Sequence, residues 1–282
     1  MCLRILLVFI MILIFACAPN VRVTETYKSN QKKTEEVVKG EGSSAKIVKR
    51  IDYYSNGQIK TEAKITNKKL NGKYLAYHPN GVVYQKGQYK TDKEKGEWTY
   101  FNTSGQIDSI HTFKEGLLDG KTEYNVYGKL IIKQEYKSGK KNGNFIEYYT
   151  DGNKKVTGSY LMNLPNDEWI WYDLKEFKTR QINFKNGLKH GDFKVWKDND
   201  LYLSGIFDED KKSGTWKWHR TKKDLDSLVN YVNGEINGLY EAWYDNGVLS
   251  VKGSFESGIP TGKWEWFSEN NTLDSTKTFK NG

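Results

Sequence analysis

The stretch Gly238-Leu239-Tyr240-Glu241-Ala242-Trp243-Tyr244-Asp245-Asn246-Gly247 carries the pattern that predicts the fold, because the same pattern recurs along most of the chain. A small residue is followed two positions later by an aromatic residue, five positions later by a second one, and then by Asn-Gly. Aromatic residues favour strands. Asn-Gly between two such runs favours a two-residue hairpin turn of type I′, which needs positive φ at both central residues. The stretch therefore predicts a β-strand that ends in a tight turn.

The small residue that opens this pattern recurs at nearly constant spacing. The intervals between successive copies are 24, 24, 23, 24, 24, 23, 24 and 24 residues. The positions are Gly72, Gly96, Gly120, Gly143, Asp167, Gly191, Gly214, Gly238 and Gly262. Counting back from Gly72 places an earlier copy at Val48. This regularity predicts about ten tandem copies of 23–24 residues over residues 48–282.

Each copy also contains a second strand and a second turn. The second strand ends in an aromatic residue, and three residues later only Gly, Asn or Asp occurs, at Asp92, Gly116, Gly139, Asn163, Gly187, Asp210, Gly234, Gly258 and Gly282. These residues best tolerate a left-handed backbone. The copies therefore predict an all-β fold, an elongated antiparallel β-meander built from two-strand repeats. Residues 173–176 and 221–224 lack the Asn-Gly signal, so irregular hairpins are expected there.

The N-terminal 47 residues differ from the repeats. Residues 1–16 have the basic start and apolar run of a signal peptide. The sequence Ile14-Phe15-Ala16-Cys17 resembles a bacterial lipobox, which implies that Cys17 carries the lipid of a membrane-anchored lipoprotein in the cell envelope, on the outer membrane or facing the periplasm. Residues 17–47 are polar, with few large apolar side chains, and predict a flexible tether.

The composition excludes several classes of protein. Hydrophobic residues make up 37% of the chain and aromatic residues 14%, which suits thin sheets joined by tight turns better than a deep core. The net charge is +9, but the lysines are spread over every copy, as expected on the solvated face and edges of a sheet. No nucleic-acid partner is therefore expected. Cys17 is the only cysteine beyond the signal peptide, so no internal disulfide is expected either.

The sequence lacks the usual patterns of catalytic residues and metal ligands. The four histidines, His78, His111, His190 and His219, occupy four different positions of the repeat. No nucleophile elbow, zinc-binding helix motif or phosphate-binding loop occurs. The acidic residues 208–210 fall in a turn, where carboxylates are ordinarily solvated. We therefore predict a protein that is not an enzyme and that uses no metal and no cofactor.

The aromatic residues have two interpretations. They pack copy against copy, or some of them also form an exposed binding face, because neighbouring rings cannot all point to one side of a sheet. The candidates for such a face are Trp171, Trp218, Trp243 and Trp266.

The pattern Gly-x-Trp-x-x-Tyr/Phe-x-x-Asn-Gly, best seen at residues 238–247 and 262–267, resembles the MORN repeat variant of bacterial YwqK-like proteins. The resemblance implies an extended β-meander that acts as a scaffold for proteins or lipids. We expect a lipid-anchored scaffold that binds a protein or a surface polymer, with an unknown oligomeric state. One alternative is a YwqK-like antitoxin or immunity protein that neutralises a toxin by direct binding. The other is an envelope enzyme that acts on polysaccharide.

Overall fold

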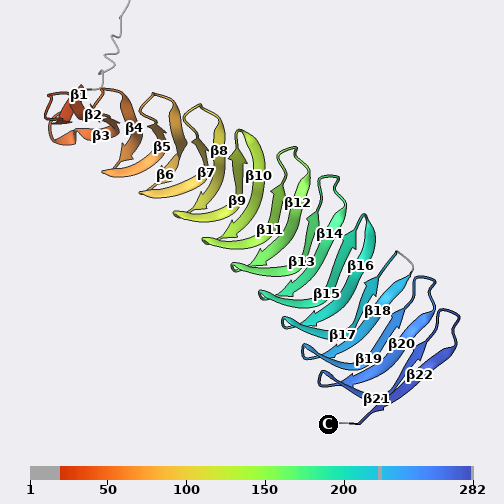
Figure 1. The fold of residues 1–282 in the computed structure, drawn as a ribbon. Coiled ribbons are helices and arrows are strands. Elements are labelled where there is room, and N and C mark those ends of the chain that lie inside the picture. Colours follow the sequence, from red (N-terminus) through yellow and green to blue (C-terminus); the bar gives the residue numbers. More distant parts are fainter. Residues whose placement is uncertain (1–19, 222–223, 281–282) are drawn as a thin grey trace, which may run out of the picture. The chain divides into compact units, whose positions relative to one another are not determined.

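The computed structural model describes residues 20–221 and 224–280 (Figure 1). The expected signal peptide and Cys17 lie outside the described residues. In the part of the chain that is described, no helix has the length and hydropathy to cross a membrane.

The described residues form one antiparallel sheet of 22 strands, with the strands following one another in chain order as a meander. The elements are β1 (Asn20–Thr26), β2 (Lys32–Lys39), η1 (Gly42–Ser44), β3 (Lys46–Tyr53), β4 (Ile59–Thr66), β5 (Lys69–Tyr77), β6 (Val83–Lys90), β7 (Lys93–Phe101), β8 (Ile107–Lys114), β9 (Leu117–Val126), β10 (Lys129–Lys137), β11 (Lys140–Tyr148), β12 (Lys154–Leu161), β13 (Leu164–Tyr172), β14 (Lys178–Lys185), β15 (Leu188–Lys197), β16 (Asp200–Asp208), β17 (Lys211–His219), β18 (Leu225–Val232), β19 (Glu235–Trp243), β20 (Leu249–Glu256), β21 (Ile259–Phe267) and β22 (Leu273–Phe279). The predicted all-β meander with two strands per repeat is confirmed.

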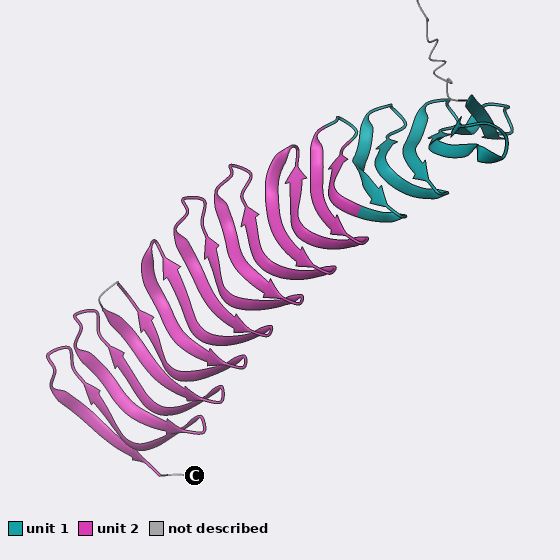
Figure 2. Ribbon diagram, turned by 180° about the vertical axis from the view of Figure 1, so that it is seen from behind, with its two compact units in different colours: residues 1–94, 103–105 teal, residues 95–102, 106–282 magenta. Residues whose placement is uncertain are grey.

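The chain divides into two compact units (Figure 2). The first contains residues 1–94 and 103–105, and the second contains residues 95–102 and 106–282. The first unit holds β1 to β6, and the second holds most of β7 and all strands from β8 to β22. The second unit therefore contains most of the repeats.

The predicted flexible tether of residues 17–47 differs from the structure over the residues that are described. β1 and β2 form an antiparallel pair, and β2 pairs in turn with β3 of the first repeat. The side chains of Glu35 and Glu36 are buried in this region. Glu36 accepts hydrogen bonds from Arg22, at 2.7 Å, and from Arg50, at 3.3 Å. The prediction failed because paired charges, rather than apolar side chains, fill this interface.

In most copies the first turn is not the predicted type I′ turn. In the turn after β3, the amide of Gly57 donates to the carbonyl of Tyr54 at 2.9 Å, and the amide of Tyr54 donates to Gln58 at 2.8 Å. Only Gly57 has positive φ, at 85°. These bonds define a three-residue loop in which a type I turn is followed by a left-handed glycine. Asn56 contributes through its side chain, whose Oδ1 accepts from the Gln58 amide at 3.1 Å.

Type I′ turns form the second turn of the repeat. Both central residues have positive φ at 67–68, 91–92, 115–116, 138–139, 162–163, 186–187, 209–210, 233–234 and 257–258. The predicted left-handed position is therefore confirmed from Asp92 to Gly258, while Gly282 lies outside the described residues. Lys68, in the first copy, has φ 64° without being Gly, Asn or Asp.

The turn at 173–177 is regular, although its sequence lacks Asn-Gly. Its amides make the same two bonds as the other first turns, from Asp173 to Phe177 at 2.9 Å and from Glu176 to Asp173 at 3.0 Å. Glu176 takes the place of the glycine, with φ 62°. The prediction of an irregular hairpin is therefore wrong for this copy. In the next such turn, the amide of Arg220 donates to Asp224 at 3.0 Å, the same outer bond.

The two intervals of 23 residues arise in the first turn. After Gly120 and after Gly191, the three-residue loop is replaced by a two-residue turn, Tyr127-Gly128 and Asp198-Asn199, in which both residues have positive φ. The flanking residues pair directly, as Lys197 does with Asp200. Each of these two hairpins therefore has one residue fewer in its first turn. The register of the strands is otherwise the same as in the other copies.

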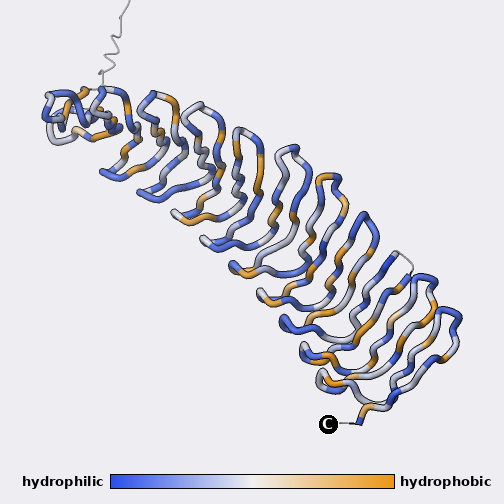
Figure 3. The backbone as a smooth tube through the Cα atoms, in the orientation of Figure 1, coloured by the Kyte–Doolittle hydropathy of each residue, from blue (hydrophilic) through white to orange (hydrophobic). Residues whose placement is uncertain are grey.

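Hydrophilic and hydrophobic residues are intermixed along the strands of the repeats (Figure 3). One face carries most of the buried rings, and the other carries cross-strand ion pairs such as Lys252–Glu265, at 2.9 Å, and Lys133–Glu123, at 3.4 Å. Strand alternation places residues i and i+2 on the same face, so each repeat contributes one aromatic side and one charged side.

Candidate functional site

The buried core of the second unit is a row of rings across the sheet. Trp169, Trp216 and Trp264 are 7%, 1% and 7% exposed. Each stacks near the ring of the preceding copy, as Phe193 does with Trp216 at a centroid distance of 5.4 Å. Each also contacts the ring that ends the preceding second strand, edge to face, as Phe207 does with Trp216 at 5.0 Å. These contacts join neighbouring copies, which explains why the copies fold as an array.

Three of the four predicted binding-face tryptophans lie on this same face. Trp171, Trp218 and Trp266 each follow a buried tryptophan by two residues and contact its ring, at centroid distances of 6.1, 6.5 and 6.0 Å. They are half-buried, whereas the core tryptophans are buried. They therefore occupy one equivalent repeat position beside the core.

Trp243 does not belong with them. It stands one position further along its copy, where strand alternation directs the side chain to the opposite face. The equivalent residue Tyr172 confirms the direction, because its hydroxyl lies 3.5 Å from that of Thr157, which pairs with Ile170. The four predicted residues thus divide three to one between the two faces.

The exposed parts of these rings differ in what covers them. The guanidinium of Arg180 lies 4.1 Å from the centroid of Trp171 and occupies one side of its ring. Lys212 lies 4.5 Å from the ring of Trp216 but 5.7 Å from that of Trp218. Trp218 is therefore better placed than Trp171 to contact a ligand.

Trp218 also lines a cavity of about 450 Å³ at the first-turn edge of the second unit. The cavity lies between the short turn of residues 198–199 and the strand ends at 218–226. Its lining contains Lys197, Asp198, Asp200, Leu201, Tyr202, Trp218, His219, Arg220 and Asp226. A second cavity, of about 520 Å³, lies on the other side of the short turn and is lined by Tyr149, Asp173, Leu174, Lys175, Phe177 and Asp198. Asp198 lines both. We call the two cavities together the turn trough.

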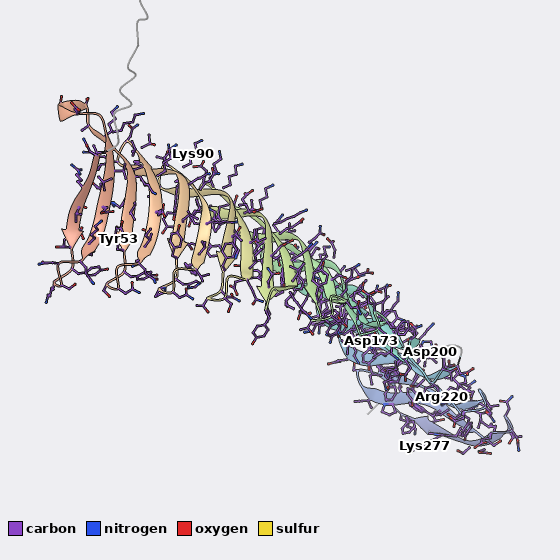
Figure 4. The ribbon with its side chains drawn as sticks, turned by 90° about the horizontal axis from the view of Figure 1, so that it is seen from above. Tyr53, Lys90, Asp173, Asp200, Arg220 and Lys277 are labelled. Carbon is purple, nitrogen blue, oxygen red and sulfur yellow. The ribbon has the colours of Figure 1, made fainter. Side chains whose placement is uncertain are left out.

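The trough follows from the missing residue in the short turn. The turns at 173–177 and 220–224 keep the longer loop, whereas the turn between them has only Asp198-Asn199. The shorter hairpin leaves a hollow on each side of it. Figure 4 labels Asp173, Asp200 and Arg220 in succession along this edge.

Three charged side chains of the trough, those of Asp173, Arg220 and Asp226, are held by hydrogen bonds or ion pairs to other residues. Arg220 donates to the carbonyls of Trp243 and Tyr244, at 3.0 and 2.9 Å. It also pairs with Asp226 and Asp245, each at 2.9 Å. The carboxylate of Asp173 accepts the turn amides of Lys175 and Phe177, at 2.8 and 2.9 Å.

Two carboxylates differ from the rest. Asp198 and Asp200 are exposed, and they make no side-chain hydrogen bond or ion pair with the residues that the structure describes. They stand on either side of Asn199, next to Tyr202 and Lys197, whose ammonium lies 3.6 Å from the Tyr202 ring centroid. These carboxylates are free to accept hydrogen bonds from a ligand.

His219 forms part of the wall of the trough. Burial lowers the pKa of its imidazole, and the charge of Lys217 lowers it further. His219 is therefore neutral near pH 7. Both of its ring nitrogens are buried, without a hydrogen-bond partner among the described residues.

In the part of the chain that the structure describes, the histidines and acidic residues do not converge on a metal site. Across residues 20–221 and 224–280, no group of three His, Cys, Asp or Glu side chains has the arrangement to hold a metal ion. His190 instead lies 3.1 Å from Asp208 near the second-turn edge. The acidic residues 208–210 lie at a type I′ turn and are exposed, and Asp210 Oδ1 accepts a hydrogen bond from the amide of Lys189 at 2.9 Å.

Trp218 was predicted from the sequence as a candidate binding residue, whereas the trough around it was not predicted. The available signal was the 23-residue interval after Gly191, which locates a shortened hairpin without revealing which of its turns is shorter. Asp198 lies in the shortened turn, and the equivalents of Asp200 and Tyr202 in the other copies are mostly of other residue types, so periodicity did not mark them.

Comparison with known proteins gives a family match for four of the repeats. Segments 70–91, 94–115, 236–257 and 260–281 match the family described as MORN repeat variant. The chain therefore carries MORN repeat variants, and the two segments of each neighbouring pair begin 24 residues apart. No curated protein matches the chain.

Several solved structures match with low similarity. A crystal structure of TcdB2-TccC3-Cdc42 is 10% identical with a TM-score of 0.21, over 88% of this chain and 17% of that chain. A crystal structure of TcdB2-TccC3 is 10% identical with a TM-score of 0.14, over 88% and 17%. The Tc holotoxin pore of Photorhabdus luminescens is 11% identical with a TM-score of 0.15, over 92% and 16%. The chain thus spans about a sixth of the length of the chains it matches.

Proposed function

Starting from an array of MORN repeat variants, we propose that this chain is a non-catalytic scaffold of the bacterial cell envelope that binds a protein or a surface polymer. Lipid on Cys17 anchors it to the membrane, and the aromatic face of its sheet holds the partner. The observation that carries the proposal is the recurrence of half-buried tryptophans, at 171, 218 and 266, in one repeat position beside a buried core. Partly exposed aromatic rings in a fixed frame are typical of binding surfaces.

The ordered array supports a scaffold. Neighbouring copies are joined by core rings and by bonds between their turns, such as the hydroxyl of Tyr244 to the carbonyl of Phe267 at 2.8 Å. The same bond joins Tyr149 to Tyr172 at 2.8 Å. A frame built in this way presents side chains at regular intervals, which suits an extended partner.

Affinity capture from the organism's own envelope tests the binding role. The bait is the full chain, compared with a triple variant in which Trp171, Trp218 and Trp266 are changed to alanine. Trp243→Ala is the control, because it removes a tryptophan from the opposite face. We expect one envelope component, protein or polymer, to be retained by the wild type and the control and lost from the triple variant. Equal retention by all three would refute binding through this face. Capture of a toxin would instead favour the alternative of an immunity protein that neutralises a toxin by direct binding.

Metabolic labelling with palmitate tests the anchor. Label incorporated by the wild type and absent from Cys17→Ala is the expected result. Label that persists in Cys17→Ala would remove the lipid from the proposal and leave the binding face to be judged by capture alone.

A further inference from the structure

The turn trough combines aromatic surface with free carboxylates. Trp218 and Tyr202 line one cavity, and Tyr149 and Phe177 line the other. Phe177 is 44% exposed. The two cavities, of about 450 and 520 Å³, lie within the range of about 300–1,000 Å³ that small-molecule sites occupy. The trough therefore has room for a ligand, and Trp218 and Phe177 offer rings on which it can stack. Lys197 lies 3.6 Å from the centroid of Tyr202 and covers one side of that ring.

The charges of the lining select against strongly charged ligands. The cationic side chains of the trough are Lys175, Lys197 and Arg220, and the anionic ones are Asp173, Asp198, Asp200 and Asp226. Three positive charges against four negative ones leave the lining almost balanced. A nucleic acid or an anionic polymer needs a clear excess of positive charge, and the trough does not provide it.

We infer that the turn trough binds a short segment of a neutral, hydroxyl-rich glycan, with sugar rings stacked on its aromatic side chains and hydroxyls bound by Asp198 and Asp200. Each pyranose ring has a face rich in C–H groups, which packs on an aromatic ring, and a rim of hydroxyls. Ionised carboxylates accept only, and hydroxyl-to-carboxylate bonds are short and strong. The inference rests on the proposed function, and it names a class of surface polymer that the scaffold takes.

The division of roles within the trough supports a binding site. Asp173 holds its turn through two backbone amides, and Arg220 holds the next turn through two carbonyls. These residues form a fixed frame. Asp198 and Asp200 are left free within that frame, beside the one hairpin of this region that is a residue shorter. The short turn thus opens the trough, and its residue Asp198 and the flanking Asp200 supply the free acceptors.

Calorimetric titration of the full chain tests the inference with defined saccharides. The probes are tetrasaccharides of β-1,4-linked glucose, β-1,4-linked N-acetylglucosamine and α-1,4-linked glucose, together with a tetralysine peptide. We expect at least one tetrasaccharide to bind and tetralysine not to bind. Trp218→Ala and the double variant Asp198→Asn, Asp200→Asn are each expected to raise the Kd at least tenfold. Trp243→Ala, on the opposite face of the sheet and outside the lining of the trough, is expected to change the Kd less than twofold.

A turn graft separates the trough from the rest of the aromatic face. Residues 198–199 are replaced by Ser-Asn-Gly, the three residues that form the longer turn at 55–57. The graft fills the gap in the row of turns with a loop that this fold already uses. The control is the same graft at residues 127–128, the other two-residue first turn. We expect loss of saccharide binding in the first graft alone, with circular dichroism and melting temperature unchanged in both.

Three results would overturn the inference: no tetrasaccharide binds, the graft at 198–199 binds as tightly as the wild type, or tetralysine binds in place of the saccharides. The last result would assign the trough to a basic peptide. The outcomes are distinguishable from those of the capture experiment. Capture that depends on the three tryptophans but not on the graft would leave the proposed function intact and remove the glycan site. Saccharide binding without envelope capture would leave the glycan site intact and remove the proposed capture of an envelope partner through the three tryptophans.

Discussion

The indole of Trp216 lies directly against the backbone of Gly205 on the neighbouring strand. A Cβ atom added to Gly205 would lie 2.3 Å from the indole atom Cδ2. The same arrangement joins Trp169 to Gly158 and Trp264 to Gly253, at 2.3 and 2.1 Å. Where the ring is smaller, the facing residue is larger: Phe193 pairs with Ile182, and Tyr240 pairs with Val229. The ring and the residue that faces it therefore share the core volume between them, as close packing requires.

Gly205→Ala is expected to destabilise the second unit by about 1–3 kcal/mol, because the added methyl group forces the indole out of its packed position. Chemical denaturation followed by tryptophan fluorescence measures the change. A compensating pair is available in the chain itself. Gly205→Val with Trp216→Tyr recreates the Val229–Tyr240 pair, and it is expected to be more stable than Gly205→Val alone. If the destabilisation of the double variant equals the sum of the destabilisations of Gly205→Val and Trp216→Tyr, the two side chains do not share the core volume between them.

The fold was predictable from the sequence because each repeat has the same weak signals at the same positions. No single turn or aromatic residue identifies a strand, but Gly72, Gly96 and their equivalents fix the register of the whole array. The turn types were not predictable from Asn-Gly alone. At Asn56-Gly57 the asparagine side chain caps the loop, and only the glycine is left-handed, whereas the type I′ geometry falls at the second turn. A dipeptide preference does not distinguish these two uses of Asn and Gly.

Tyr127→Asn is expected to stabilise the chain by about 0.5–1 kcal/mol. Tyr127 is the first residue of a type I′ turn, with φ 50°, and its side chain is 86% exposed. Asparagine tolerates a left-handed backbone better than tyrosine, and little packing is lost with an exposed ring. The melting temperature measured by calorimetry should rise by a few degrees. A lower melting temperature would show that the ring of Tyr127 makes a stabilising contact.

Glu36→Gln is expected to loosen β1 and β2 at neutral pH. The carboxylate of Glu36 is buried and is held by Arg22 and Arg50, so its neutral replacement loses charge-assisted hydrogen bonds of about 1.5–3 kcal/mol. Hydrogen exchange of the backbone amides of residues 20–53, measured by mass spectrometry, reports the opening of this region. Glu25→Gln is the control, because Glu25 pairs with Lys33 at 2.7 Å on the exposed surface. Equal protection in all three proteins would contradict a stabilising role for Glu36.

The same region should lose stability in acid. The hydrogen bond from Arg22 holds the pKa of Glu36 below its usual value. Lys32 and the hydroxyl of Tyr53 do the same for Glu35. A lowered folded-state pKa contributes stability that is fully present above the unfolded value of about 4.3 and is lost as the pH falls through the folded pKa. Exchange protection of residues 20–53, corrected for the intrinsic rate, should therefore decline below about pH 4. If exchange protection declines with falling pH to the same extent in Glu36→Gln, the protonation of Glu36 does not cause the loss of stability in acid.

The candidate site was predictable only in part, for a physical reason. Periodicity marks what all copies share, so it found the aromatic positions that include Trp218. Departures from the repeat carry no such signal. The trough arises from the single residue missing beside Asp198, and the polar segment before the first repeat is ordered by the pairing of Glu36 with Arg22 and Arg50. Both depend on contacts between residues whose partners the sequence does not reveal.

Arg220 takes the place that a tyrosine has in other copies, and its replacement by tyrosine should be tolerated. The hydroxyl of Tyr244 donates to the carbonyl of Phe267 at 2.8 Å, and Arg220 Nη2 donates to the equivalent carbonyl of Trp243 at 3.0 Å. Arg220→Ala is expected to cost about 1–3 kcal/mol, because the carbonyls of Trp243 and Tyr244 lose a charged donor. Arg220→Tyr restores the bond to Trp243 and should recover at least half of the loss.

Denaturation of the two variants and of Asp245→Ala separates this bond from the ion pairs of Arg220. The carboxylate of Asp245 is 92% exposed, so its removal should change the stability by less than about 0.5 kcal/mol. If the Arg220→Tyr variant is as unstable as the Arg220→Ala variant, the hydrogen bond to the carbonyl of Trp243 is not the source of the stability. A large loss in Asp245→Ala would assign that stability to the ion pair instead, because Asp245 contacts Arg220 only through its side chain at 2.9 Å.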